Sequence, residues 1–126
     1  MSVGLNHTIV HVRDSRESAA FMADILGLAA PEPFYHFLVV QTANGVSLDF
    51  LSTTEKFLVE HYAFLVSETE FDQIFARIKG RGLSYWADPA TSRPGEINTR
   101  DGGRGLYFKE PSGHLLEILT RPYGGG

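Results

Sequence analysis

The segment L-N-H-T-I-V at residues 5–10 is matched by V-E-H-Y-A-F at residues 59–64. The segment S-L-D-F-L-S at residues 47–52 is matched in the same way by L-L-E-I-L-T at residues 115–120. All four segments are rich in residues that favour strands, and several alternate in polarity. Because an internal repeat indicates a duplicated structural unit, these matches predict two copies of one module.

Each half of the chain carries a helix signal soon after its first predicted strand. Asp14 and Ser15 are favourable N-cap residues ahead of an amphipathic stretch, and Gly27 lies where that helix should end. In the second half, Ser67 and Glu70 form a capping-box signature ahead of another amphipathic stretch. The order of strand, helix and further strands is therefore expected twice.

Turn signals separate the remaining strands. Further strands are predicted at residues 34–41, 46–52, 105–109 and 115–120. Asn44-Gly45 is a strong hairpin signal between the first two of these, whereas residues 88–103 are rich in Pro and Gly and predict a long loop. The sequence therefore favours an α+β fold of two βαβββ modules, at about residues 1–54 and 55–122.

Composition limits the classes of function. The 126-residue chain has a net charge of -4, no Lys/Arg run and no cysteine. Nucleic acid, disulfides and a cysteine nucleophile are therefore not expected. No long apolar run or signal peptide is evident, so we expect a cytoplasmic protein without a membrane partner. Residues 124–126 are all glycine and are expected to form a frayed end.

The repeat superposes His7 on His61, and Asp49 on Glu117. Each acid stands between two large apolar residues, where a carboxylate is costly unless it is paired or bound to metal. A lone strand histidine is more often a surface residue than a ligand, and a lone acid can protect a sheet edge. The matched quartet instead predicts one site for a divalent ion. Two imidazoles and two carboxylates suit Mn, Fe, Co, Ni or Zn.

Three segments resemble the vicinal oxygen chelate superfamily of glyoxalases, bleomycin-resistance proteins, fosfomycin-resistance transferases and extradiol dioxygenases. They are G-L-N-H-T-I-V-H-V at residues 4–12, E-H-Y-A-F at 60–64 and Y-F-K-E-P-S-G-H-L-L-E at 107–117. The resemblance implies one domain over residues 1–126, whose two modules form an open, eight-stranded, barrel-like cleft around the metal. It also implies a homodimer. It gives ligand roles to His7, His61 and Glu117, and extends one to Asp49, a position that varies in the family.

The resemblance leaves several reactions open. We expect a metalloenzyme of the glyoxalase-like group that uses Lewis-acid, non-redox chemistry of isomerase, lyase or transferase type on a small vicinally oxygenated substrate. Glu117 would anchor the metal, Asp49 would act as the mobile base, and Tyr107 would donate a hydrogen bond into the cleft. Any thiol would have to come from a cosubstrate.

The alternatives are a drug-binding protein like the bleomycin-resistance members, or an extradiol-type dioxygenase. Ring-cleaving relatives place a histidine where this chain has Asn98, Thr99 and Arg100, which counts against the dioxygenase. Arg100 and Arg104 are candidates for binding an anionic group. His36 and His114 are expected at the surface, near turns.

Overall fold

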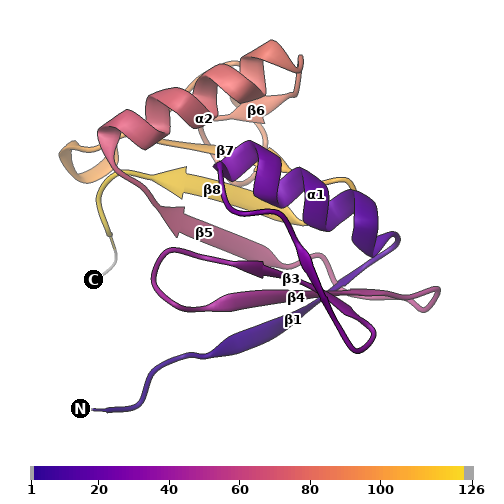
Figure 1. Ribbon diagram of the computed structural model, residues 1–126. Helices are drawn as coiled ribbons and strands as arrows, with labels where there is room; N and C mark the ends of the chain where they lie inside the picture. The colour runs from indigo at the N-terminus through magenta and orange to yellow at the C-terminus, as the bar shows by residue number, and fades with distance from the viewer. Residues whose placement is uncertain (1, 124–126) are drawn as a thin grey trace. The chain divides into compact units, whose positions relative to one another are not determined.

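The predicted order of elements is present in both halves of the computed structural model, which describes residues 2–123 (Figure 1). The first module contains β1 (His7–Val12), α1 (Ser15–Leu26), β2 (Glu32–Phe34), β3 (Phe37–Gln41) and β4 (Ser47–Ser52). The second contains β5 (His61–Leu65), α2 (Glu68–Gly80), β6 (Tyr85–Trp86), the 3₁₀ turn Arg100–Gly102, β7 (Gly105–Lys109) and β8 (Leu115–Leu119). The βαβββ modules are therefore confirmed. The predicted frayed end at residues 124–126 lies outside the described residues.

The chain divides into two compact units, with the boundary between Leu58 and Val59. Each unit has its own four-stranded sheet, with strand order β1-β4-β3-β2 in the first and β5-β8-β7-β6 in the second. The two sheets therefore share one topology. Over residues 2–123 every hydrogen-bonded strand pair lies within one of these two sheets.

The two modules also share one strand register. In each, the first strand lies at the sheet edge and pairs in parallel with the last strand, which lies inside the sheet. The histidine of the edge strand pairs with the residue two positions before the carboxylate of the inner strand. His7 and Asp49 have this relation in the first module, and His61 and Glu117 have it in the second. The sequence repeat is therefore a repeat of three-dimensional positions.

Local caps fix both helices as predicted. The Asp14 side chain accepts hydrogen bonds from two backbone amides at the start of α1, and Gly27 ends the helix with a φ of 70°. A left-handed residue of this kind favours glycine because it has no Cβ. At the start of α2, Ser67 and Glu70 form the full capping box, with bonds of 2.8 and 3.1 Å.

The apolar neighbours of the two acids belong to the core. Leu48, Phe50, Leu116 and Ile118 are between 0 and 4% exposed. Burial of a side chain of this size stabilises the fold by about 1.5–3 kcal/mol. Because successive strand residues point to opposite faces, Asp49 and Glu117 must point away from these side chains. Both acids therefore lie on the sheet face opposite their buried apolar neighbours.

The segment predicted as one strand at residues 34–41 is two strands instead. Phe34 pairs with Phe37, so Tyr35 and His36 form a tight turn between β2 and β3. Tyr35 has a φ of 52°, a conformation usually taken by Gly, Asn or Asp. The turn therefore lacked its usual sequence signal. The hairpin predicted at Asn44-Gly45 is confirmed by the antiparallel pairing of β3 with β4.

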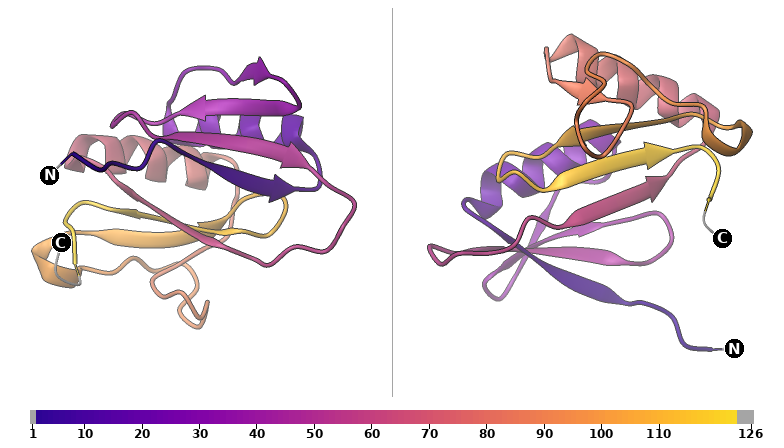
Figure 2. Two further views of the ribbon diagram at one scale, coloured as in Figure 1. Left: turned by 90° about the horizontal axis from the view of Figure 1, so that it is seen from below. Right: turned by 180° about the vertical axis from the view of Figure 1, so that it is seen from behind.

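The long loop of the second module is partly ordered by isolated bridges, including one between Asn98 and Gly105. Asn98 Nδ2 donates a hydrogen bond to the Ala87 carbonyl at 2.9 Å. A Cβ at Gly105 would lie 3.0 Å from the Asn98 side chain, so this close approach favours glycine. Arg100 of this loop donates a 2.9 Å hydrogen bond to Tyr107 on β7, and Figure 2 shows the course of the loop between β6 and β7 from two further sides. Within residues 2–123, neither helix has the length and apolar character needed to span a membrane.

Candidate metal centre

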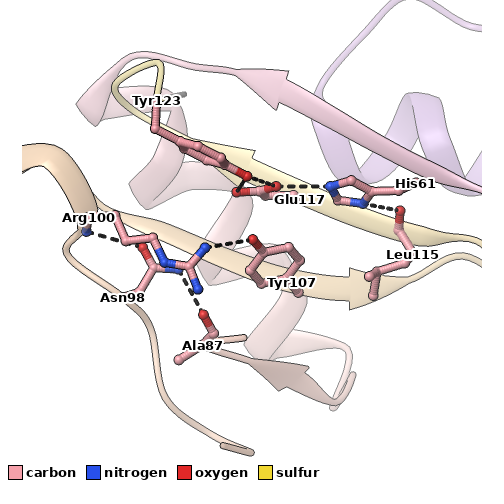
Figure 3. Close-up of polar contacts among 8 residues, drawn as sticks. All are labelled: His61, Ala87, Asn98, Arg100, Tyr107, Leu115, Glu117 and Tyr123. Atoms are coloured by element: carbon pink, nitrogen blue, oxygen red, sulfur yellow. Dashed lines mark hydrogen bonds and ion pairs between the residues drawn. The ribbon is translucent and has the colours of Figure 1, made fainter. Parts of the chain in front are cut away.

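In the second module, His61 and Glu117 meet across the β5–β8 pair (Figure 3). His61 Nε2 lies 3.0 Å from Glu117 Oε1. The Glu117 side chain is 1% exposed, whereas that of His61 is 44% exposed. The pair therefore joins a buried carboxylate to an imidazole that solvent and solutes can reach.

The hydrogen bond of His61 Nδ1 indicates the hydrogen-bonding role of His61 Nε2. His61 Nδ1 lies 3.1 Å from the backbone carbonyl of Leu115. A carbonyl can only accept, so Nδ1 carries the hydrogen, and in a neutral ring Nε2 presents a lone pair to Glu117. Two acceptors facing each other need a cation, either a proton or a metal ion. Metal-binding histidines usually donate their other N–H to a carbonyl or carboxylate, as His61 does.

The spacing of these two atoms also suits a metal ion. Histidine nitrogens and carboxylate oxygens bind divalent ions at about 2.0–2.2 Å, so two such donors on one ion would lie about 3–3.5 Å apart. The measured His61 Nε2–Glu117 Oε1 distance is 3.0 Å. This separation suits two donors of one ion as well as it suits a hydrogen bond.

The first module presents the matching pair. His7 is exposed, and its Nδ1 lies 2.7 Å from Asn6 Oδ1. An oxygen acceptor again takes the Nδ1 hydrogen and leaves Nε2 available. Asp49 is 7% exposed, and its Oδ1 is the one buried side-chain polar atom in residues 2–123 without a hydrogen-bond partner. An unpaired buried carboxylate oxygen is costly, so a bound cation is a natural partner.

His7 and Asp49 line a cleft of about 630 Å³ in the first module. This volume lies within the usual range of small-molecule sites. Ala29, Ala30, Pro33, Phe34 and Val39 form its apolar part, and Asn6, Glu32, Gln41 and Ser47 add polar groups. The two predicted ligands of this module therefore border a space of substrate size.

No group of three or more His, Asp or Glu side chains within residues 2–123 is arranged to hold a metal ion. The structure brings His61 and Glu117 into direct contact and places His7 and Asp49 on one cleft. Each module thus supplies a pair of donors. The joining of both pairs on one ion stays a prediction.

Tyr107 is a direct neighbour of both His61 and Glu117. It pairs with Glu117 across β7 and β8, is 1% exposed, and stacks on the His61 ring with centroids 5.8 Å apart. Its hydroxyl accepts a 2.9 Å hydrogen bond from Arg100 Nη1, which raises the pKa of Arg100 above its ordinary value. Arg100 thus binds the predicted catalytic tyrosine. The predicted role of Tyr107 towards a substrate stays a prediction.

Tyr123 completes this group and was missed from the sequence. Its hydroxyl lies 3.0 Å from Glu117 Oε1 and 3.2 Å from Oε2. A hydrogen bond with Tyr107 raises the pKa of Tyr123 well above its ordinary value, and burial and Glu117 add to this effect. The hydroxyl therefore keeps its proton at neutral pH. Tyr123 follows β8 and belongs to no periodic pattern, so no sequence signal pointed to it.

Arg104 and His114 differ from their suggested roles. Arg104 forms ion pairs with Glu68 at 2.8 Å and Asp72 at 2.9 Å, so it is engaged at the start of α2. His114, expected at the surface, is 1% exposed, and its Nδ1 accepts the backbone N–H of Glu60 at 2.9 Å. It anchors the chain one residue before His61. His36 is exposed, as predicted.

Comparison with known proteins identifies the family. The model of the Glyoxalase/Bleomycin resistance protein/Dioxygenase superfamily matches residues 4–118. This chain belongs to that superfamily. The match includes all four predicted ligand positions and Tyr107, and it confirms the vicinal oxygen chelate resemblance. Tyr123 lies beyond the matched residues.

Individual superfamily members resemble the chain to different degrees. The structure of Oxidase ChaP-H1 is 64% identical, with a TM-score of 0.96 over 98% of this chain and 100% of that one. Oxidase ChaP-H2 is 60% identical, with a TM-score of 0.94 over 100% of both chains. Metallothiol transferase FosB of Shouchella clausii is 27% identical over 93% of this chain and 80% of its own length. The relatives of this chain thus include two proteins named as oxidases and one named as a transferase.

Proposed function

We propose that this protein is a metal-dependent oxidase acting on a small substrate with two adjacent oxygen atoms. We assign His7, His61 and Glu117 to one divalent ion as its firm ligands, and Asp49 as a fourth carboxylate that would bind the ion less firmly and so remain able to accept a proton. The observation that carries the metal assignment is that His61 Nε2 lies 3.0 Å from Glu117 Oε1 while its Nδ1 lies 3.1 Å from the Leu115 carbonyl. The unpaired Oδ1 of Asp49 supports it from the first module.

The oxidative reaction is proposed from a comparison. The sequence alone favours non-redox chemistry, because it has two acids and lacks the histidine before Tyr107. Oxidase ChaP-H1, however, is 64% identical over 98% of this chain. Two histidines and one carboxylate with open positions are also typical of non-haem iron enzymes that use dioxygen. We therefore assign dioxygen as the oxidant.

A bound ion of this class would supply a Lewis acid for the two substrate oxygens and, as iron or manganese, a redox centre. His7, His61 and Glu117 would hold it. Asp49, with its unpaired Oδ1, would accept the proton of a substrate hydroxyl. Tyr107 would keep the His61 ring in place by stacking. The cleft beside His7 and Asp49 would receive the body of the substrate and exclude water from it.

The second candidate is the non-redox chemistry that the sequence favours. Its support is the pair of symmetry-related carboxylates and the 27% identity with a metallothiol transferase. One acid would anchor the ion while the other moved a proton at carbon. The drug-binding alternative gains no support, because both donor pairs are present.

Oxygen uptake separates the two candidates. Metal-free protein is loaded anaerobically with Fe²⁺ or Mn²⁺ and mixed with a panel of catechols and hydroxyquinones in an oxygen electrode. We expect metal-dependent oxygen consumption that is lost in His61→Ala and kept in His36→Ala, which removes an exposed histidine from the β2–β3 turn. Thiol addition to an epoxide, or isomerisation of a hemithioacetal, without oxygen uptake would favour the second candidate.

A further inference from the structure

Tyr123 reaches back over the site from the segment that follows β8. Its hydroxyl lies within hydrogen-bond distance of both Glu117 oxygens, at 3.0 and 3.2 Å. The Tyr123 hydroxyl therefore contacts both oxygens of the Glu117 carboxylate, and in Figure 3 it does so from the side opposite His61 and Leu115. Tyr123 is 42% exposed, so burial in the core does not by itself force its hydroxyl against Glu117.

Glu117 needs an external group to fix its direction. Its Cα is held by β8, but three side-chain torsions separate the carboxylate from the backbone. His61 contacts Oε1 alone, which leaves rotation of the carboxylate plane open. Contacts to both oxygens from Tyr123 remove that freedom.

Tyr123 is itself held in position. Its hydroxyl is hydrogen-bonded to Tyr107, a residue that is 1% exposed. Tyr107 in turn accepts the hydrogen bond from Arg100 at 2.9 Å. The order Arg100, Tyr107, Tyr123, Glu117 thus links a loop cation to the carboxylate through two phenols. Such a linked group holds the phenol more firmly than a tyrosine without these hydrogen bonds would be held.

We propose that Tyr123 is a positioning residue that orients the Glu117 carboxylate through its hydroxyl and thereby sets how tightly the chain holds its divalent ion. This inference rests on the proposed function. Partners that orient a metal ligand usually contribute 10–100-fold to metal affinity, so Tyr123→Phe should weaken binding by roughly that factor. The phenylalanine keeps the ring and removes the hydrogen bonds.

The test measures binding and not turnover. Mn²⁺ is titrated into metal-free wild type, Tyr123→Phe and Tyr85→Phe, and the free ion is followed by its electron paramagnetic resonance signal. Tyr85 lies on β6 of the same module and packs on Phe75, so Tyr85→Phe is a matched loss of a hydroxyl. Absorption spectra of the Co²⁺-loaded proteins report the ligand geometry, and thermal unfolding of the metal-free proteins reports stability.

We expect Tyr123→Phe alone to bind Mn²⁺ roughly 10–100-fold more weakly and to change the Co²⁺ spectrum, with no matching loss of metal-free stability. Equal affinity in Tyr123→Phe and wild type, or tighter binding in the variant, overturns the inference and leaves the metal site standing. A wild type that takes up neither ion overturns the inference and the proposed function together.

Discussion

His61 Nε2 and Glu117 Oε1 lie 3.0 Å apart, while the other ring nitrogen of His61 bonds to the Leu115 carbonyl. This relationship leaves a lone pair and a carboxylate facing each other at the edge of a buried site. His7 and Asp49 have the same strand register in the first module. A cation shared with each histidine, as we propose, would compensate the two acids for their positions between core residues.

The two acids should have separable roles. Asp49→Asn should lose roughly 10²–10⁴-fold in turnover while it keeps most of the bound metal, because the unpaired Asp49 carboxylate is the proposed base. Glu117→Gln should lose metal as well, because Glu117 directly faces His61. Turnover and metal content are measured on the same preparations. Equal loss of metal in both variants would contradict the assignment of Asp49 as base.

His114 should matter for stability although it is outside the ligand set. His114→Ala removes a buried ring and leaves the Glu60 N–H without the acceptor it has at 2.9 Å. The expected loss is roughly 2–4 kcal/mol in the free energy of unfolding, measured in urea on metal-free protein. His36→Ala is the control and should change stability by less than about 0.5 kcal/mol. Similar values for the two variants would show that His114 does not anchor β5.

The fold of two similar modules could be predicted because the sequence contains an internal repeat. The strands that carry the histidine and the carboxylate occur in both halves, so each copy strengthens the assignment of the other. The helix boundaries could be predicted because the capping residues act locally, and the structure keeps both caps. The β2–β3 turn could not be predicted, because Tyr35 takes a left-handed conformation without the usual Gly or Asn. The pairing of β2 with β3 holds this turn in place, and that pairing cannot be recognised from the local sequence.

The contact between His61 and Glu117 could be anticipated from the sequence, but the residues that support it could not. His61 and Glu117 superpose on His7 and Asp49, so the repeat singled out all four. The hydrogen bonds of Tyr123 and Arg100 depend on how the C-terminal segment and the long loop fold back. Neither segment has a periodic pattern of apolar residues from which its position in the fold could be predicted. His114 was misjudged because a histidine beside a turn is usually exposed, whereas here it accepts the Glu60 amide.

The protein should form a homodimer. Several apolar side chains on and before β1 are exposed, including Leu5 at 70% and Ile9 at 43%. Burying such a surface against a second copy would remove it from water, and a stable interface of standard size buries about 800 Å² on each partner. Sedimentation velocity at micromolar concentration should give twice the mass of the chain. A single species with the mass of one chain would refute the dimer.

The most direct test of the account is the metal content of protein purified without chelator. Elemental analysis should find about one divalent ion per chain in the wild type and in His36→Ala. His7→Ala and His61→Ala should each abolish binding, because each removes one imidazole of the proposed quartet. Full metal content retained in both of these variants would contradict the assignment of His7, Asp49, His61 and Glu117 as the metal site.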